Sequence, residues 1–334
     1  MPESTHELWW SQIHGPRQLK NEIENVLLTP GRGLWIDGRI SWPEALYRLV
    51  KNELGEKDSQ ICLTYLDANS KEFQQMEPSD QISQLNPDAL SRCMPGKPLA
   101  EFVRDNRVLE THILWISNLN IAQHENWLSL SRELAQLKTG FQIICQGQLG
   151  RGKYTNLVRL QAKDYSTQFD HILFAMQLAA EYGVSSDMQI YYTYLAVGIA
   201  DGWAENIPIL MKSPDALTRD PAAYTAELGF DQAGLEQILH KVQVKALLPI
   251  LEERQEHLVD ELSDVIELPF YDEYGRKFQE LYEVELRNMY YFYQNKKLPM
   301  SPTQVKQLEQ LYKLRNMVAH RQIVPGEMVM DFLL

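Results

Sequence analysis

The chain has 334 residues, and its 45 acidic side chains outnumber the 32 basic ones, which gives a formal charge of −13 at pH 7. Because a net negative field repels phosphate, this balance excludes a protein that coats nucleic acid without specificity. Hydrophobic residues make up 44% of the chain, which is enough for two or three folded domains and excludes wholesale disorder.

The sequence also excludes a membrane-spanning protein. No apolar run approaches the roughly 18 residues of a membrane span, and the first residues are polar, so we expect a cytoplasmic protein without membrane contact. The three cysteines (Cys62, Cys93 and Cys145) lie far apart, and neither they nor the histidines have the spacing of a metal site or a disulfide framework. We therefore expect no metal and no cofactor.

The first half of the chain alternates short apolar runs with helical stretches. Continuous apolar runs are typical of parallel strands that are buried on both faces, so residues 1–165 are expected to form a three-layer α/β domain. The expected strands are residues 33–36, 61–66, 112–117, 141–145 and 157–160, and the expected helices between them are residues 43–54, 99–105 and 126–137.

The loop after the first expected strand is where a nucleotide-binding domain of this class holds phosphate. Such a loop needs glycines, a Lys for the phosphates and a Ser or Thr for Mg²⁺. Only Gly38 and Ser41 fit this pattern, and the third expected strand runs into Ser117 and Asn118 where an acid would hold the metal. We therefore expect no ATPase activity.

A second glycine-rich loop lies at residues 147–153, and its Gly147, Gly152 and Lys153 fit the spacing GxxxxGK. Tyr154 stands where the hydroxyl ligand would be, and a strand is expected next instead of the helix whose N-terminus binds phosphate. Two interpretations stay open, a basic loop between two strands or an anion-binding loop that senses a nucleotide.

The order of these elements, with the opening segment 13–19, resembles the ATPase domains of the AAA+ and STAND classes over about residues 8–210. The resemblance lies in the layout and not in catalytic motifs. It implies a degenerate P-loop-like domain that has lost hydrolysis and serves as a regulatory module, with a protein partner bound through this part of the chain.

Strand signals end near residue 168. We expect a helical extension and linker over residues 166–230, in which 208–230 is a connection, and an all-α helical bundle over residues 231–334. The segments with helical spacing are 169–182, 187–202, 231–242, 246–266, 273–296 and 302–321.

The last expected helix carries the most informative residues. At about 100° per residue its apolar side chains share one broad arc, and Arg315 points into the middle of it. A buried Arg is costly unless it is paired, and we expect its partner to be Glu285 on the apolar face of the preceding helix. Asn316 and His320 are four residues apart, so they can hydrogen-bond each other.

The pattern Arg315-Asn316-x-x-x-His320 resembles the motif of the HEPN superfamily, many of whose members are metal-independent ribonucleases. The resemblance implies that these three residues are catalytic, and that Glu285 and Tyr312 support them. It also implies that two motif helices meet across a dimer axis, in a homodimer or with a related subunit. The alternative role for Arg315 is a purely structural ion pair. The Arg-x₄-His spacing alone does not identify the family, because the same spacing recurs at residues 107–112.

Ribonuclease chemistry suits these residue types. RNA can be cleaved by its own 2′-hydroxyl, so the protein has to move protons and stabilise charge on phosphorus. An imidazole exchanges protons near neutral pH, and a guanidinium stays charged and binds phosphoryl oxygens. The aromatic run 290–293 can stack on bases, anchor an interface or fill a core.

Charge is segregated within the second half. Residues 252–285 hold twelve acids and three bases, whereas residues 286–321 hold seven Lys and Arg side chains and the single acid Glu309. A basic patch around the motif would attract a phosphate, but the same segregation would also let an acidic helix hold a basic one.

The leading hypothesis is a HEPN-like, metal-independent endoribonuclease, a toxin or anti-phage defence effector, fused to a catalytically silent ATPase-like module. RNA is then the substrate. The rival is a non-enzymatic scaffold, in which a pseudo-ATPase and an inactive HEPN-like dimerisation domain hold partners in a defence complex.

Overall fold

The protein is described by a computed structural model that covers residues 5–29, 31–90, 96–148, 157–181, 186–272 and 274–334. Contacts between residues divide the chain into two compact units, Met1–Phe174 and Ala175–Leu334. The division falls inside helix α8 (Gln168–Glu181), and residues 175–230 group with the helices that follow them rather than forming a separate linker. Within the described residues, no helix has both the length and the apolar character that crossing a membrane would require.

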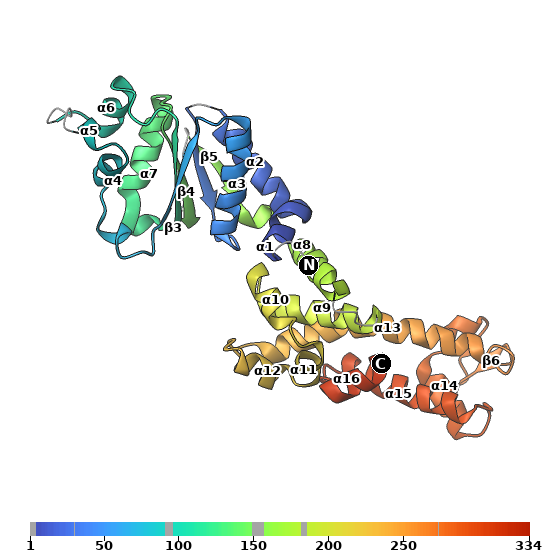
Figure 1. The fold of residues 1–334 in the computed structure, drawn as a ribbon. Helices are drawn as coiled ribbons and strands as arrows, with labels where there is room; N and C mark the ends of the chain where they lie inside the picture. Colours follow the sequence, from blue (N-terminus) through green and yellow to red (C-terminus); the bar gives the residue numbers. More distant parts are fainter. Residues whose placement is uncertain (1–4, 30, 91–95, 149–156, 182–185, 273) are drawn as a thin grey trace. The chain divides into compact units, whose positions relative to one another are not determined.

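The first unit is built around a sheet whose described strands all pair in parallel, in the order β2-β3-β4-β1-β5 (Figure 1). A strand lies at each of the five expected places, which confirms the α/β class. The strands are β1 (Gly33–Asp37), β2 (Cys62–Asp67), β3 (His112–Asn120), β4 (Gln142–Gln148) and β5 (Leu157–Gln161).

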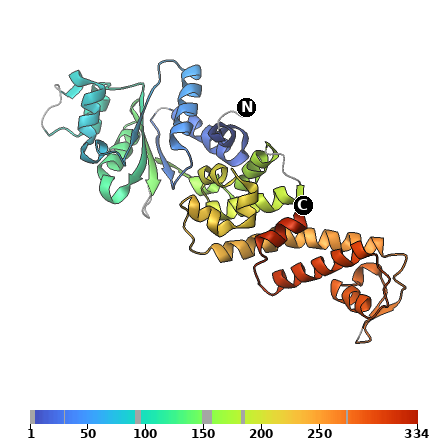
Figure 2. The same cartoon turned by 60° about the horizontal axis from the view of Figure 1, so that its bottom comes forward.

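Helices cover both faces of this sheet, with α2 and α3 on one face and α7 on the other (Figures 1 and 2). Because neighbouring residues of a strand point to opposite faces, Leu114 packs in the core on the α7 side while Trp115 meets Tyr47 of α3, with ring centroids 6.3 Å apart. The helices of this unit are α1 (Thr5–Glu7), η1 (Leu8–Gln12), α2 (His14–Leu27), α3 (Pro43–Lys57), η2 (Phe73–Gln75), α4 (Pro78–Leu85), α5 (Pro87–Leu90), α6 (Leu99–Asp105), α7 (Ile121–Gln136), η3 (Ala162–Asp164) and the start of α8.

The second unit is mainly helical, and the long helix α13 is its centre. Helix α13 packs against α9 on one side and α15 on another, and α15 also contacts α14 (Figure 2). The elements that follow α8 are α9 (Ser186–Ala200), η4 (Ala204–Asn206), α10 (Ile207–Leu210), α11 (Pro214–Arg219), α12 (Pro221–Glu227), α13 (Leu235–Glu261), β6 (Phe270–Tyr271), β7 (Lys277–Phe278), η5 (Leu281–Glu283), α14 (Leu286–Gln294), α15 (Pro302–Ala319) and α16 (Gly326–Leu333).

Two expectations about these helices are wrong. Residues 208–230 are not an open connection, because α10, α11 and α12 lie there, and both α11 and α12 begin at a Pro, which suits the first turn of a helix. Most of the segments 231–242 and 246–266 belongs to one helix, α13, which starts at Leu235, continues through Pro249 and ends at Glu261.

The expected helix over residues 273–296 is also wrong in its first half, before Leu286. Strands β6 and β7 form a hairpin there, and its turn is closed by Asp272, whose Oδ1 accepts hydrogen bonds from the backbone N–H groups of Tyr274 and Arg276 at 2.9 Å each. Gly275 has φ +78°, a left-handed conformation that a glycine adopts without strain. Helix α14 therefore begins only at Leu286.

Candidate functional site

Helix α15 carries the motif residues and has well-defined ends. At its start the Ser301 hydroxyl accepts from the backbone N–H of Gln304 at 3.3 Å. At its end Arg321 adopts φ +58°, and the N–H of Gln322 donates to the carbonyl of Met317 at 2.8 Å, which is the Schellman closure of a helix. His320 is thus the last residue before the chain leaves the helix.

Arg315 is exposed, so the prediction that it is buried on the apolar face is wrong. The buried stripe of α15 is narrower than the arc of apolar residues, and it consists of Leu308, Leu311, Leu314 and Val318. Ala319, one turn after Arg315, is exposed as well. Helix α15 contacts α13 and α14, and the side chains of the buried stripe are the ones that this packing encloses.

The expected pair between Glu285 and Arg315 does not form. Glu285 is exposed and occupies the N-cap position of α14, where its backbone N–H donates to the Asn288 side chain at 3.1 Å. Among the ion pairs of the described residues, none involves Arg315. The prediction of a buried ion pair between Glu285 and Arg315 is therefore wrong.

Asn316, His320 and Tyr312 share one side of α15 because they are four residues apart. They line a surface hollow of about 550 Å³ together with Glu309, Lys313, Met317, Gln322 and Tyr290 of α14. No side-chain hydrogen bond joins Asn316 to His320 in this described part of the chain, contrary to our expectation. The link between them is the helical one, from His320 N to Asn316 O at 3.0 Å.

An aromatic pair closes one side of this hollow. The rings of Tyr290 and Tyr312 are parallel within 3°, with their centroids 4.6 Å apart, and both residues are half-buried. The sequence showed the aromatic run but not this contact, because the pairing depends on how α14 meets α15. The spacing of Tyr312, Asn316 and His320 was the signal that could have revealed the shared hollow.

Arg315 lies outside the hollow. It is five residues from His320, so the two side chains leave the helix about 140° apart. One copy of α15 therefore directs the imidazole and the guanidinium to different sides.

The basic side chains on α15 form no ion pairs with acidic side chains in the described part of the chain. Lys306, Lys313 and Arg315 are exposed and make no ion pair there, although α13, the acidic helix, packs against α15. The start of α15 meets the end of α13 through a hydrogen bond from Gln304 to Glu261 at 3.3 Å. The charge segregation therefore does not serve to hold α13 and α15 together.

The second Arg-x₄-His match has a different setting. Arg107 lies before β3 and has a left-handed backbone, with φ +49°. His112 is the first residue of β3. The Nδ1 atom of His112 is buried without a hydrogen-bond partner, and burial lowers the pKa of this imidazole. Only the match on α15 presents its His to solvent from a helix.

In the first unit, the loop between β1 and α3 is arranged unlike a phosphate-binding loop. Trp42 caps α3 in a left-handed conformation, with φ +47°, and its carbonyl accepts the backbone N–H groups of Ala45 and Leu46 at 3.0 and 3.1 Å. Pro43 begins the helix and has no N–H to offer. Three of the first four residues of the helix therefore offer no free backbone N–H group to a phosphate.

The polar residues at the ends of β1 and β3 are engaged with neighbours. Asp37 pairs with Arg159 of β5, whose Nε lies 3.2 Å from Asp37 Oδ2. The Ser117 hydroxyl donates to Tyr65 at 2.8 Å, and the Asn118 amide donates to Asp67 at 3.0 Å. These contacts serve the sheet itself.

Gly147 has a structural role in β4. The register of β3 against β4 shifts between Ile116 and Leu119, and a Cβ atom at Gly147 would lie 1.9 Å from the carbonyl oxygen of Leu119. A glycine is required by this backbone contact. Gly152 and Lys153, the other members of the expected anion-binding loop, lie outside the described residues.

No protein-family model and no curated protein matches this chain. Among solved structures, Trip13 from Rhizobiales has a TM-score of 0.37 at 11% identity, over 66% of this chain and 89% of that chain. Cdc6p from Pyrobaculum aerophilum has a TM-score of 0.39 at 13% identity, over 98% of this chain and 99% of that chain.

Proposed function

We propose that the second unit is a HEPN-like, metal-independent endoribonuclease and that α15 supplies half of its active site. The observation that carries the proposal is the surface of this helix. Arg315 and His320 are exposed there and make no ion pair with another described residue, and Asn316 lines a hollow beside His320. An exposed guanidinium without a carboxylate partner is available to an anionic ligand such as a phosphate.

The chemistry follows from the side chains. His320 takes the proton from a ribose 2′-hydroxyl, whose oxygen attacks the adjacent phosphorus, and Arg315 binds the phosphoryl oxygens as they gain charge. The bond from phosphorus to the 5′-oxygen breaks, that oxygen receives a proton, and the products are a 2′,3′-cyclic phosphate and a 5′-hydroxyl. A base next to the cleaved bond stacks in the hollow against Tyr290 or Tyr312.

A second motif helix completes the site in this proposal. The side chains of Arg315 and His320 leave one helix about 140° apart, so one copy does not direct both groups to the same phosphate. In the proposed site, Arg315 of one copy and His320 of another contact the phosphate together. The first unit then acts as a catalytically silent module, which is supported by the engaged first turn of α3 and by the paired Asp37.

The test is RNA cleavage in the presence of EDTA by wild type, His320→Ala and the control His257→Ala. His257 is an exposed histidine on α13, away from the motif. We expect wild type and His257→Ala to cut RNA at the same rate, and His320→Ala to be slower by about 10²–10⁴-fold, the usual contribution of a general acid or base.

Two outcomes would contradict the proposal. Equal cleavage by His320→Ala and wild type would place the activity elsewhere. The absence of cleavage by a wild-type protein that light scattering shows to be a dimer would favour the scaffold hypothesis, in which α15 serves only for pairing.

A further inference from the structure

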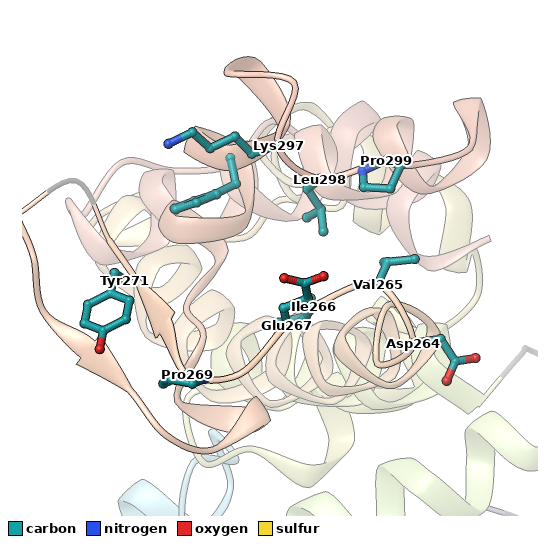
Figure 3. A pocket seen from close by; sticks show the side chains of 10 residues that line it. Asp264, Val265, Ile266, Glu267, Pro269, Tyr271, Lys297, Leu298 and Pro299 are labelled. Carbon is teal, nitrogen blue, oxygen red and sulfur yellow. The ribbon is translucent and has the colours of Figure 1, made fainter.

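The segment between α13 and α14 holds a second surface hollow, which we call the tip groove. It has a volume of about 600 Å³ (Figure 3). Its apolar lining includes Ile266 and Leu298, which are buried, and Pro269, Tyr271 and Phe292. The groove is thus large enough for one or two side chains of another molecule.

Exposed apolar side chains are concentrated in the part of the sequence from which Val265 and Tyr271 line the tip groove. The described chain has eleven large hydrophobic residues that are exposed, and five of them fall within residues 265–282. These five are Val265, Leu268, Tyr271, Tyr274 and Tyr282. A local concentration of exposed apolar surface marks an interaction site more often than scattered exposure does.

The aromatic residues near the groove are held in place. Tyr274 accepts a hydrogen bond from Arg287 at 2.8 Å, and Tyr282 donates one to Asp260 at 2.6 Å. The hairpin beneath them is anchored by Phe278, which is 1% exposed and lies under the Arg276 guanidinium at 4.8 Å. Rings fixed in this way lose little conformational freedom when a partner binds.

The charge of the groove is negative and unneutralised. Figure 3 shows the carboxylate of Glu267 in the middle of the groove, between Leu298 and the end of α13, and Asp264 at its rim. Neither carboxylate makes an ion pair or a hydrogen bond with another described side chain. The basic lining residue, Lys297, lies over the ring of Phe292 at 5.3 Å.

We propose that the tip groove binds a segment of a partner protein in which an Arg or Lys stands next to an aliphatic or aromatic residue. The cationic group pairs with Glu267, and the apolar residue packs against Val265 and Leu298. Nucleic acid does not fit this surface, because residues 252–285 carry twelve acids and three bases. The proposal is independent of the ribonuclease activity, which uses α15.

The experiment is a selection of random 12-residue peptides on the full chain, with removal of peptides that also bind the Glu267→Lys variant. We expect the selected peptides to share a basic residue beside an apolar one. Fluorescence anisotropy of one labelled peptide then gives its Kd for wild type and Glu267→Gln. We expect the loss of this charge to raise the Kd about tenfold or more, since charged hydrogen bonds are the strong ones.

The control is Glu236→Gln, which removes an equally exposed carboxylate from the first turn of α13. It should leave the Kd unchanged, and Val265→Ser should raise the Kd severalfold. Selected peptides without basic residues, no selected peptide at all, or equal Kd values for wild type and Glu267→Gln would overturn the proposal. A dimer that Glu267→Gln dissociates would assign the groove to a second copy and would overturn it too.

Discussion

Two groups of charged side chains, one on α2 and α3 of the first unit and one on α15 of the second, are used in opposite ways. In the first unit, Lys20 and Glu24 of α2 are buried, with side chains only 8% and 4% exposed, and they join Glu53 and Lys57 of α3 in one network. In the second unit, Lys306, Lys313 and Arg315 of α15 are exposed and form no ion pair with any carboxylate in the described part of the chain. Charge that is enclosed and paired holds helices together, whereas charge left open and unpaired is available to a ligand.

The network of the first unit is tightly coupled. Burial raises the pKa of Glu24, while the pKa of Glu53 is lowered by hydrogen bonds with Glu24 and Lys20, which outweigh the effect of burial. Lys20 Nζ lies 3.2 Å from Glu24 Oε1, and Lys57 Nζ lies 2.8 Å from Glu24 Oε2. Removal of the central cation would leave two neighbouring carboxylates with one partly exposed lysine.

The largest expected effect is therefore that of Lys20→Met. It keeps the apolar stem but removes the buried charge, and we expect it to lower the free energy of unfolding of the first unit by about 3 kcal/mol. The control is Arg48→Ala, which breaks an exposed pair with Glu44 on α3 and should cost less than about 0.5 kcal/mol. Urea unfolding measures the free energy of unfolding of both variants. A similar small loss of stability in both would contradict the conclusion that the buried, paired charges hold α2 and α3 together.

The next effect concerns Gly147, which sequence patterns suggested as an anion-binding residue. Gly147→Ala should destabilise the first unit by about 2 kcal/mol, because its Cβ would overlap the carbonyl of Leu119. Gly55→Ala is the matched control, since Gly55 lies in α3 and has open space around it, so alanine should stabilise by about 0.5–1 kcal/mol. Thermal unfolding of the two variants should shift the Tm in opposite directions, and a tolerated Gly147→Ala would refute the structural role.

A smaller effect separates two arginines of the second unit. Arg254 stacks on Phe332 at 4.3 Å and pairs with Asp187 at 2.8 Å, so Arg254→Ala should cost about 1–2 kcal/mol. Arg315→Ala should change the free energy of unfolding by less than about 0.5 kcal/mol, because its side chain is exposed. If Arg315→Ala were as destabilising as Arg254→Ala in urea, Arg315 would be a structural residue after all.

The smallest effect is a pH dependence from His112. Because burial lowers its pKa below that of the unfolded chain, the unfolded state binds more protons just below about pH 6.5, and stability falls as the pH falls. His112→Gln should reduce the loss of stability between pH 7 and pH 5.5. Urea midpoints at the two pH values test this, and an identical loss in both proteins would exclude His112 as a contributor.

The sequence predicted the sheet well because a strand that is buried on both faces is a continuous run of apolar residues, which is visible in the local sequence. Runs such as Ile113–Ile116 are continuously apolar, and the structure places a strand at each such run. The helix predicted over residues 302–321 was equally visible, and the structure has it as α15, from Pro302 to Ala319.

What failed depends on distant parts of the chain. The apolar arc of α15 did not reveal that Arg315 is exposed, because the part of the arc that is buried depends on how α13 and α14 pack against α15. The hairpin at residues 270–278 replaced an expected helix, and the tip groove was not foreseen. Its signal was present as exposed aromatic residues within an acidic stretch, but a sequence does not show which aromatic residues are buried.

The central claim is that the exposed basic side chains of α15 bind RNA. The most direct measurement is the binding of a 2′-O-methyl RNA at several salt concentrations, because an RNA without free 2′-hydroxyl groups cannot be cleaved by this chemistry. The account predicts that Arg315→Ala raises the Kd about tenfold and lowers the slope of log K against log salt by about 0.7, the contribution of one lost phosphate contact on a single strand. Lys277→Ala, which removes an exposed base from the hairpin, should leave both values unchanged. Binding that is the same for wild type and Arg315→Ala, or equally weakened by Lys277→Ala, would contradict the claim.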